Sequence, residues 1–338
     1  MGKIPVFYSE KSFLHNPPYE IFNGNKDPHA ETPERIKSTM NALKNSEIVQ
    51  ISTATADALP WVSKVHDLDY LDFLKRSSDR LKEGEFIYPS VFPYTAEAKV
   101  ANELAERGKY MFDLYTPIMR GTLETAVESA ACAVDGAKLL LEGERVVYAL
   151  SRPPGHHAER SRMGGYCYIN NVAIAAEFLR ANNARRIAIF DFDLHHGNGT
   201  QNIFYDRGDV LYVSIHASPE IKFPYYSGFS DEEGVGEGKG FNHNFPLQQD
   251  IGDDEYHAVV GKAFKIISDY KPDYLLVSAG FDTHEQDPIG AFKLSTAYYG
   301  KLGRFIADFD IPTLSVQEGG YATKVLGENV VTYIKGFV

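Results

Sequence analysis

Short apolar runs alternate with longer segments of helical periodicity along most of the chain. The apolar runs predict buried strands over Val146–Leu150, Arg186–Phe190, Val210–Ile215, Tyr274–Ser278 and Pro312–Val316. Apolar residues at helical spacing predict helices over Leu123–Glu142, Asn171–Ala181, Asp254–Tyr270 and Thr296–Phe309. This alternation predicts a single α/β domain over residues 1–338, with a central, mostly parallel sheet flanked by helices on both faces.

The N-terminal third is less regular. Met1–Tyr8 leads directly into a strand-like run without a signal-peptide core, and Thr32 followed by Pro33 predicts a helix start with Thr32 as N-cap. Residues 78–114 interrupt the alternation, and the piece Ile87–Tyr94 is rich in proline and aromatic residues. We expect an insertion there that packs either against a second subunit or as a surface hairpin on its own chain.

Composition limits the classes of partner. The chain has 338 residues, of which 43% are hydrophobic, and no apolar stretch long enough to predict a membrane span. Cys132 and Cys167 are its only cysteines, too few for a disulfide scaffold, so a cytoplasmic protein is expected. The net charge of −12 argues against nucleic acid as a partner and would attract a cationic substrate.

Titratable residues and glycines follow the predicted strands. These groups are Arg152–His157, Asp191–Asn198, His216, Gly280–Asp282 and Glu318–Tyr321. The carboxyl ends of parallel strands meet at one edge of the sheet, where open α/β sheets bind their ligands. We therefore expect a functional site at this edge.

Metal-ligand chemistry is concentrated after the strand that ends at Phe190. Asp193 and His195 point the same way on an extended backbone because side chains alternate with period two. Asp282, at another strand end, is the best third ligand. Three protein ligands with one open position are typical of a catalytic rather than a structural zinc site.

Two adjacent histidines supply acid–base chemistry. A metal held by two carboxylates and one imidazole acidifies its water weakly, so a separate general base is needed, and His156 and His157 are the obvious pair. Each needs a partner on its other ring nitrogen. We predict that His156 pairs with Asp191 and His157 with Asn198, which gives the two imidazoles different pKa values.

The last loop, Glu318–Tyr321, contributes a phenol. Gly319 and Gly320 free the backbone before Tyr321, whose hydroxyl could donate to a developing oxyanion. Loss of one such donor typically lowers the rate by about 10²–10³-fold.

Together these motifs resemble the arginase/deacetylase superfamily, specifically the zinc-dependent histone deacetylase-like amidohydrolases. The resemblance runs from His29 to Tyr321 and is carried by Arg152–Ala158, Asp191–Gly199 and Ala279–Asp282. Within that family, Gly164–Asn171 and Asp287–Ile289 are most similar to bacterial acetylpolyamine amidohydrolases.

The resemblance implies one Zn²⁺ per chain on Asp193, His195 and Asp282. It implies His157 as general base and acid, His156 as its electrostatic partner and Tyr321 as oxyanion donor. Further residues are implied in supporting roles. Gly165, Tyr166 and Phe223 would form the walls of a narrow tunnel, and Arg35 would line an acetate channel. A K⁺ or Na⁺ ion would bind at Asp191, Asp193, His195, Ser214 and Ile215. A second cation site is matched by Phe204, Arg207, Val210 and Phe241.

The resemblance also implies hydrolysis of an acetamide on a small cationic substrate, an acetylpolyamine, by a homodimer in which residues 78–114 narrow the tunnel. Ile289 stands where eukaryotic polyamine deacetylases have a gatekeeper Glu, so another acid must recognise the substrate amine, and Asp113 is our choice.

Three other interpretations remain. The substrate could instead be acetyl-lysine in peptides, which would be hydrolysed by the same chemistry. A two-metal ureohydrolase would need an Asp-x-Asp in the last ligand loop, where Thr283 and His284 follow Asp282 instead. A binding protein without activity is disfavoured because every proposed catalytic position is filled.

Overall fold

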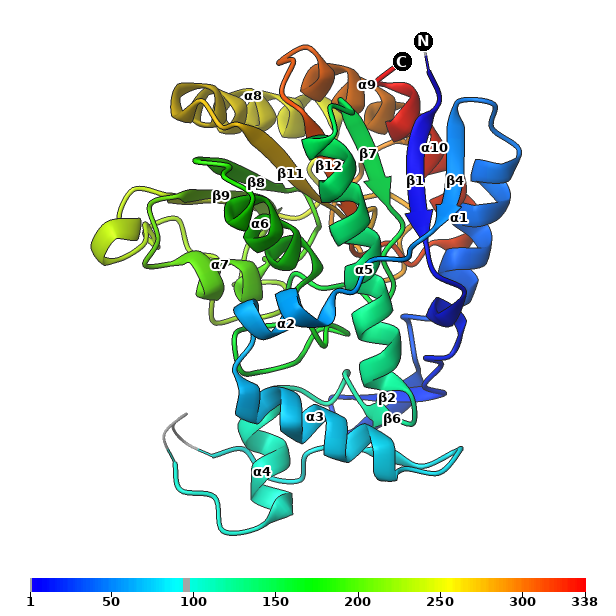
Figure 1. Ribbon diagram of the computed structural model, residues 1–338, viewed down its shortest axis with the longest axis vertical. Helices are drawn as coiled ribbons and strands as arrows, with labels where there is room; N and C mark the ends of the chain where they lie inside the picture. Colours follow the sequence, from blue (N-terminus) through cyan, green and yellow to red (C-terminus); the bar gives the residue numbers. More distant parts are fainter. Residues whose placement is uncertain (1, 94–97) are drawn as a thin grey trace.

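The computed structural model describes residues 2–93 and 98–338 (Figure 1). Its centre is an eight-stranded sheet in which every neighbouring pair is parallel. The strand order is β10-β9-β8-β11-β12-β7-β1-β4. The strands are β1 (Ile4–Tyr8), β4 (Val49–Thr53), β7 (Val146–Ala149), β8 (Ile187–Asp191), β9 (Val210–Ala217), β10 (Asn242–Leu247), β11 (Tyr274–Ala279) and β12 (Thr313–Gln317). The parallel α/β prediction is confirmed.

Helices cover both faces of the sheet. The helices α2 (Leu59–Val65), α5 (Thr122–Leu141) and α6 (Asn171–Ala181) pack together on one face. The other face carries α1 (Glu34–Lys44), α8 (Asp253–Tyr270), α9 (Thr296–Ala307) and α10 (Thr323–Lys335). The side chains of β8 alternate between the two layers, with Ile187 and Ile189 in one core and Ala188 and Phe190 in the other. A strand buried on both faces explains the continuous apolar run that predicted it.

All the strands and helices predicted from periodicity are present, with ends that agree to within two residues. The strand-like N-terminal run forms β1. Two strands of the central sheet escaped prediction. β4 lies at one edge of the sheet with only Val49 fully buried, and β10 lies at the other edge with Pro246 and polar residues, so neither carries a continuous apolar run.

The predicted start of the first helix is wrong in detail. Helix α1 begins at Glu34, and Pro33, in helical conformation, is the flanking residue. The helix has no side-chain cap hydrogen bond. Thr32 instead contributes its carbonyl oxygen, which accepts the first backbone bond from Arg35 at 3.1 Å.

A lobe of small elements lies at one end of the molecule, where α3 and α4 are labelled in Figure 1. It contains β2 (Tyr19–Phe22), β3 (Asn25–Pro28), α3 (Leu68–Arg80), β5 (Phe86–Ile87), α4 (Glu103–Tyr110) and β6 (Ile118–Met119). Residues 78–93 and 98–114 fall within this lobe, and Tyr94, the end of the predicted aromatic piece, lies outside the described residues. The insertion's role in a dimer stays a prediction.

The topology fixes where a site can form. After β8 the chain adds β9 and β10 on one side, and after β11 it adds β12 on the other. The neighbours β8 and β11 therefore flank the point where the strand order reverses. Crevices at such points are where open α/β sheets bind ligands.

Candidate active site

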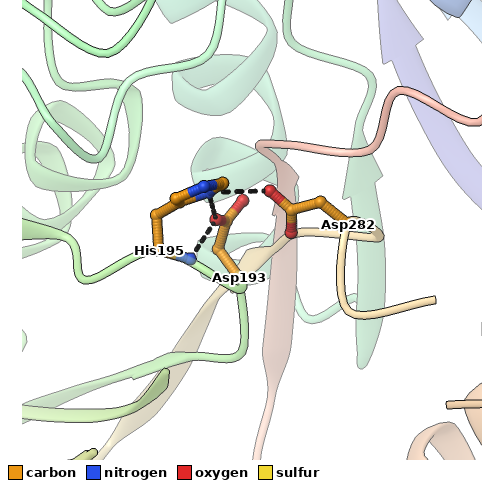
Figure 2. A group of neighbouring side chains, drawn as sticks. All are labelled: Asp193, His195 and Asp282. Carbon is orange, nitrogen blue, oxygen red and sulfur yellow. Dashed lines mark hydrogen bonds and ion pairs between the residues drawn. The ribbon is translucent and has the colours of Figure 1, made fainter. Parts of the chain in front are cut away.

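Three predicted metal ligands converge beyond the carboxyl ends of β8 and β11 (Figure 2). Nδ1 of His195 lies 3.0 Å from Oδ2 of Asp282 and 3.3 Å from Oδ1 of Asp193. One ligand atom from each residue lies within 4.8 Å of the other two. The structure thus brings together the three residues that the sequence singled out.

The surroundings of this cluster fit a metal ion. Asp193 and Asp282 are fully buried, and burying two adjacent carboxylates is costly unless a cation compensates them. Glycine lets the backbone approach them: a Cβ on Gly280 would lie 2.1 Å from Oδ2 of Asp193, and one on Gly319 would lie 2.3 Å from Oδ2 of Asp282. Two carboxylates and an imidazole are ligands that Zn²⁺ accepts.

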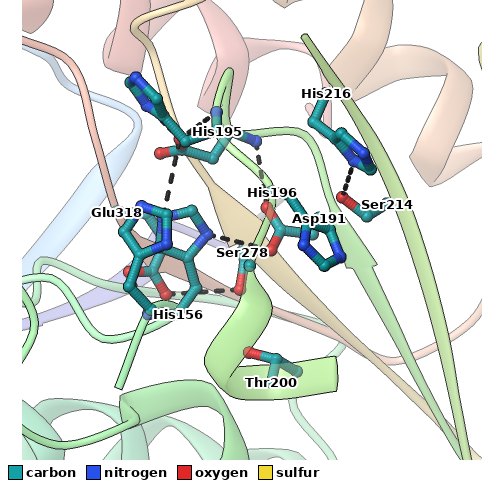
Figure 3. A network of polar contacts seen from close by, with 12 residues as sticks. His156, Asp191, His195, His196, Thr200, Ser214, His216, Ser278 and Glu318 are labelled. Carbon is teal, nitrogen blue, oxygen red and sulfur yellow. Dashed lines mark hydrogen bonds and ion pairs between the residues drawn. The ribbon is translucent and has the colours of Figure 1, made fainter. Parts of the chain in front are cut away.

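His156 lies beside the ligands and contacts Asp191, as predicted (Figure 3). Its Nδ1 is 3.1 Å from Oδ2 of Asp191, which also accepts from the Tyr212 hydroxyl at 3.0 Å. Burial disfavours the charged imidazole, but the carboxylates of Asp193 and Asp191 together raise the pKa of His156 to about 10. The carboxylate-paired histidine is the more basic of the two.

His157 contacts Asn198, as predicted, with 2.8 Å between its Nδ1 and Oδ1 of the amide. Burial, followed by the neighbouring His156 and His195, lowers the pKa of His157 well below its usual value. The ring packs against Gly165, where a Cβ would lie 2.2 Å from Cδ2 of His157. Gly165 has a φ of 56°, so both its conformation and its contact with the ring favour glycine.

Glu318 holds the histidine loop in place, a role that the sequence did not reveal. Its buried carboxylate accepts hydrogen bonds from the backbone N–H groups of Gly155 at 2.6 Å and His156 at 3.1 Å. The Ser278 hydroxyl donates to it at 3.3 Å (Figure 3). Burial raises the pKa of Glu318 to about 7.

A cavity of about 490 Å³ leads to this cluster. His157, His195 and Tyr321 line its inner part, and Phe223 packs edge-on against His157 with ring centroids 4.9 Å apart. Burial raises the pKa of the Tyr321 phenol well above its usual value, so its hydroxyl keeps the proton that it would donate. The predicted tunnel residues Gly165, Tyr166 and Phe223 line the cavity, and so does Ile289 at the gatekeeper position.

The prediction for Asp113 is not supported, because this residue does not line the cavity. Its carboxylate is buried and accepts from the backbone N–H groups of Gly165, Tyr115 and Thr116. Asp113 therefore fixes the turn that presents Gly165 and Tyr166. An acid whose oxygens are taken by the backbone is poorly placed to receive a substrate amine.

Two other acids line the outer cavity, Glu20 and Asp27. They lie directly opposite each other on the hairpin formed by β2 and β3. Its two-residue turn, Asn23-Gly24, has positive φ at both positions, 49° and 79°. Asn-Gly between short strands is the strongest short-range hairpin signal, so the sequence did contain the information that would have found this element.

The remaining predicted groups adjoin the cluster. Ser214 pairs in register with Asp191 across β8 and β9, which places Ser214 and Ile215 beside the proposed monovalent-cation residues. Arg35 is fully buried and donates to the carbonyl oxygens of Glu318 and Gly320, in the loop that carries Tyr321.

The geometry agrees with comparisons to known proteins. Residues 29–337 match the histone deacetylase domain. The chain belongs to the histone deacetylase family. Within that family it is 39% identical to acetylpolyamine amidohydrolase 1 of Pseudomonas aeruginosa over 98% of this chain and 97% of the relative. It is also 39% identical to the acetylpolyamine amidohydrolase of Mycoplana ramosa, covering 98% of each.

A solved structure agrees with these relatives. The crystal structure of acetylpolyamine aminohydrolase from Burkholderia pseudomallei superposes with a TM-score of 0.94 at 35% identity and covers 99% of this chain and 98% of that one. The family match and the amidohydrolase relatives identify the chain as an enzyme. In the part of the chain that the structure describes, no helix combines the length and hydropathy needed to cross a bilayer.

Proposed function

We propose that this protein hydrolyses the acetamide bond of acetylated polyamines and binds one Zn²⁺ per chain. The observation that carries the proposal is the convergence of Asp193, His195 and Asp282 at the inner end of a cavity that has two opposed acids in its outer part. The printed names of the relatives, acetylpolyamine amidohydrolases, support the same substrate class.

Asp193, His195 and Asp282 would hold the zinc ion, which when bound polarises the substrate carbonyl and acidifies water. The chain's own groups move the protons. His157 takes a proton from the attacking water as its oxygen bonds to the carbonyl carbon. Tyr321 donates its hydroxyl hydrogen bond to the oxyanion that forms. When the carbon–nitrogen bond breaks, a protonated histidine of the pair supplies the proton that the departing amine needs.

Glu20 and Asp27 supply the proposed recognition of the distal ammonium group. Like charges directly opposite each other on a hairpin are destabilising. Burial raises the pKa of Glu20. Hydrogen bonds from the Tyr166 side chain and from the Ala30 backbone N–H oppose that rise, and the carboxylates of Asp113 and Asp27 add to it. A cationic substrate lying between the two carboxylates would relieve this repulsion, as an acetylpolyamine does and a neutral amide does not.

Further assignments belong to the same proposal. A K⁺ or Na⁺ ion would bind at Asp191, Asp193, His195, Ser214 and Ile215. The protein would act as a cytoplasmic homodimer in which residues 78–114 contribute to the interface and narrow the substrate entrance.

A substrate panel on the zinc-reconstituted enzyme tests the proposal. We expect kcat/KM for N-acetylputrescine to exceed that for N-butylacetamide by about tenfold or more, because a charge-assisted hydrogen bond is worth about 1.5–3 kcal/mol. The two molecules share a four-carbon chain and differ in the terminal ammonium. Faster cleavage of an acetyl-lysine peptide than of every acetylated polyamine would favour the peptide deacetylase alternative instead.

Glu20→Gln separates recognition from chemistry. We expect KM for N-acetylputrescine to rise about tenfold with kcat little changed, because the variant keeps the shape of the side chain and removes its charge. KM for N-butylacetamide should stay the same. Glu34→Gln, an exposed change on α1, is the matched control. An equal change in KM for both substrates in Glu20→Gln would show that Glu20 does not recognise the ammonium group of the substrate.

A further inference from the structure

Asn198 has a second partner that the mechanism does not use. Its Nδ2 lies 2.9 Å from Oε1 of Glu159, while its Oδ1 faces the His157 ring; the same Nδ2 makes a longer contact of 3.4 Å with the His157 carbonyl oxygen. Glu159 follows His157 by two residues, so one short loop supplies both groups that the amide joins. The contacts form a continuous chain from the His157 imidazole through Asn198 to the carboxylate.

The backbone holds Glu159 in this place. Its N–H donates to the carbonyl oxygen of Arg162 at 2.9 Å, and its own carbonyl oxygen is 3.0 Å from Nδ1 of the buried His66. Gly199 lets the start of α7 (Asn198–Phe204) approach the same loop, since a Cβ there would lie 2.2 Å from the Ala158 carbonyl oxygen. The loop that carries Glu159 and the start of α7 are therefore held close together around the contact between Glu159 and Asn198.

The chemistry of the three groups allows one arrangement. An ionised carboxylate only accepts hydrogen bonds, so the amide must turn its NH₂ toward Glu159. Its carbonyl oxygen then faces His157 and can only accept, so Nδ1 must carry the hydrogen. Nε2, the nitrogen on the cavity side of the ring, is left free to take a proton.

We propose that Glu159 is a positioning residue that selects the orientation of the Asn198 amide and, through it, the tautomer of His157 competent as a base. The inference rests on the proposed role of His157 in amide hydrolysis. Without Glu159 the amide could present its NH₂ to Nδ1, which would place the ring hydrogen on Nε2 and block proton abstraction.

Other groups around Glu159 are compatible with this role. The Tyr226 hydroxyl lies 3.5 Å from Oε1, at the limit of a hydrogen bond. Burial raises the pKa of the Glu159 carboxyl, and the Arg162 guanidinium opposes that rise. Arg162 stacks over the ring of Phe112, with 5.5 Å between its guanidinium carbon and the ring centroid.

Replacement of Glu159 tests the role first. Glu159→Ala should lower kcat for N-acetylputrescine about tenfold, in the range typical of groups that orient a catalytic ligand, with KM and zinc content unchanged. Glu159→Gln keeps an oxygen that accepts from the amide and should retain most of the activity. Thermal melts show whether either variant is folded.

A swap across the contact gives the decisive comparison. Asn198→Asp alone would place a second carboxylate within contact distance of Glu159 and should lower kcat about tenfold. In a Glu159→Gln background the introduced amide can donate to the introduced carboxylate, so the same change should cost less than about threefold. Equal costs in the two backgrounds would overturn the proposal, because they would show that positions 159 and 198 do not act together on kcat.

The tautomer can be read without any substrate. In zinc-loaded protein with ¹⁵N-labelled histidine, the His157 signals, assigned by their loss in His157→Ala, should show hydrogen on Nδ1 in wild type and a mixed population in Glu159→Ala. An unchanged tautomer in that variant would refute the inference. This readout stands apart from the proposed function, which fails instead if wild-type enzyme cleaves no acetylated polyamine.

Discussion

Asp193→Ala should abolish both metal binding and turnover. The change removes one of three convergent ligands and leaves Asp282 and His195, which cannot complete the site. Loss of the metal's Lewis acidity removes several kcal/mol of transition-state stabilisation, so kcat/KM for N-acetylputrescine should fall by about 10³-fold or more. Elemental analysis after dialysis should find about one zinc per wild-type chain and a small fraction of that in the variant.

The control separates this effect from charge and folding. Asp254→Asn removes an exposed carboxylate on α8 and should keep full zinc content and activity. Asp193→Ala also loses the acceptor of the Gly319 N–H, 2.7 Å away, so its circular dichroism should be compared with wild type. A folded Asp193→Ala protein with full metal occupancy would refute the ligand assignment.

Tyr321→Phe should keep the metal and lose the chemistry. The phenol lines the inner cavity and lies edge-on to Tyr166, 5.7 Å between ring centroids, so the phenyl ring can occupy the same place. Removing the hydroxyl removes one oxyanion donor, and kcat should fall by about 10²–10³-fold with KM little changed. Steady-state kinetics and zinc analysis on the same preparation measure both quantities.

Tyr270→Phe is the matched control, since it removes a phenol at the end of α8 and should leave kcat unchanged. If Tyr321→Phe turned over like wild type, Tyr321 would have no part in oxyanion stabilisation, and the zinc ion would have to provide that stabilisation alone.

The inner site could be predicted from sequence because topology makes local motifs converge. Each catalytic group lies in the loop after a buried strand, and parallel strands end at a common edge. The pairings of His156 with Asp191 and His157 with Asn198 could also be predicted, since imidazoles at such sites need partners on both nitrogens. Strand β8 could be predicted because it is buried on both faces and therefore forms a continuous apolar run.

The outer cavity could not be predicted in the same way, because long-range packing determines it. Glu20 lies on a short hairpin far from the metal loops in sequence, and only the fold brings it to the cavity. Asp113 was misjudged because nothing in the sequence shows that its oxygens are taken by backbone N–H groups. Glu159 directly follows the predicted motif Arg152–Ala158, but its contact with Asn198 depends on how α7 approaches the histidine loop.

X-ray diffraction from crystals of the zinc-loaded enzyme, recorded on both sides of the zinc absorption edge, tests the central assignment most directly. The account predicts one anomalous peak per chain at about 2.0–2.2 Å from a carboxylate oxygen of Asp193, a ring nitrogen of His195 and a carboxylate oxygen of Asp282. Two peaks in the site, or one peak bound by other residues, would contradict it.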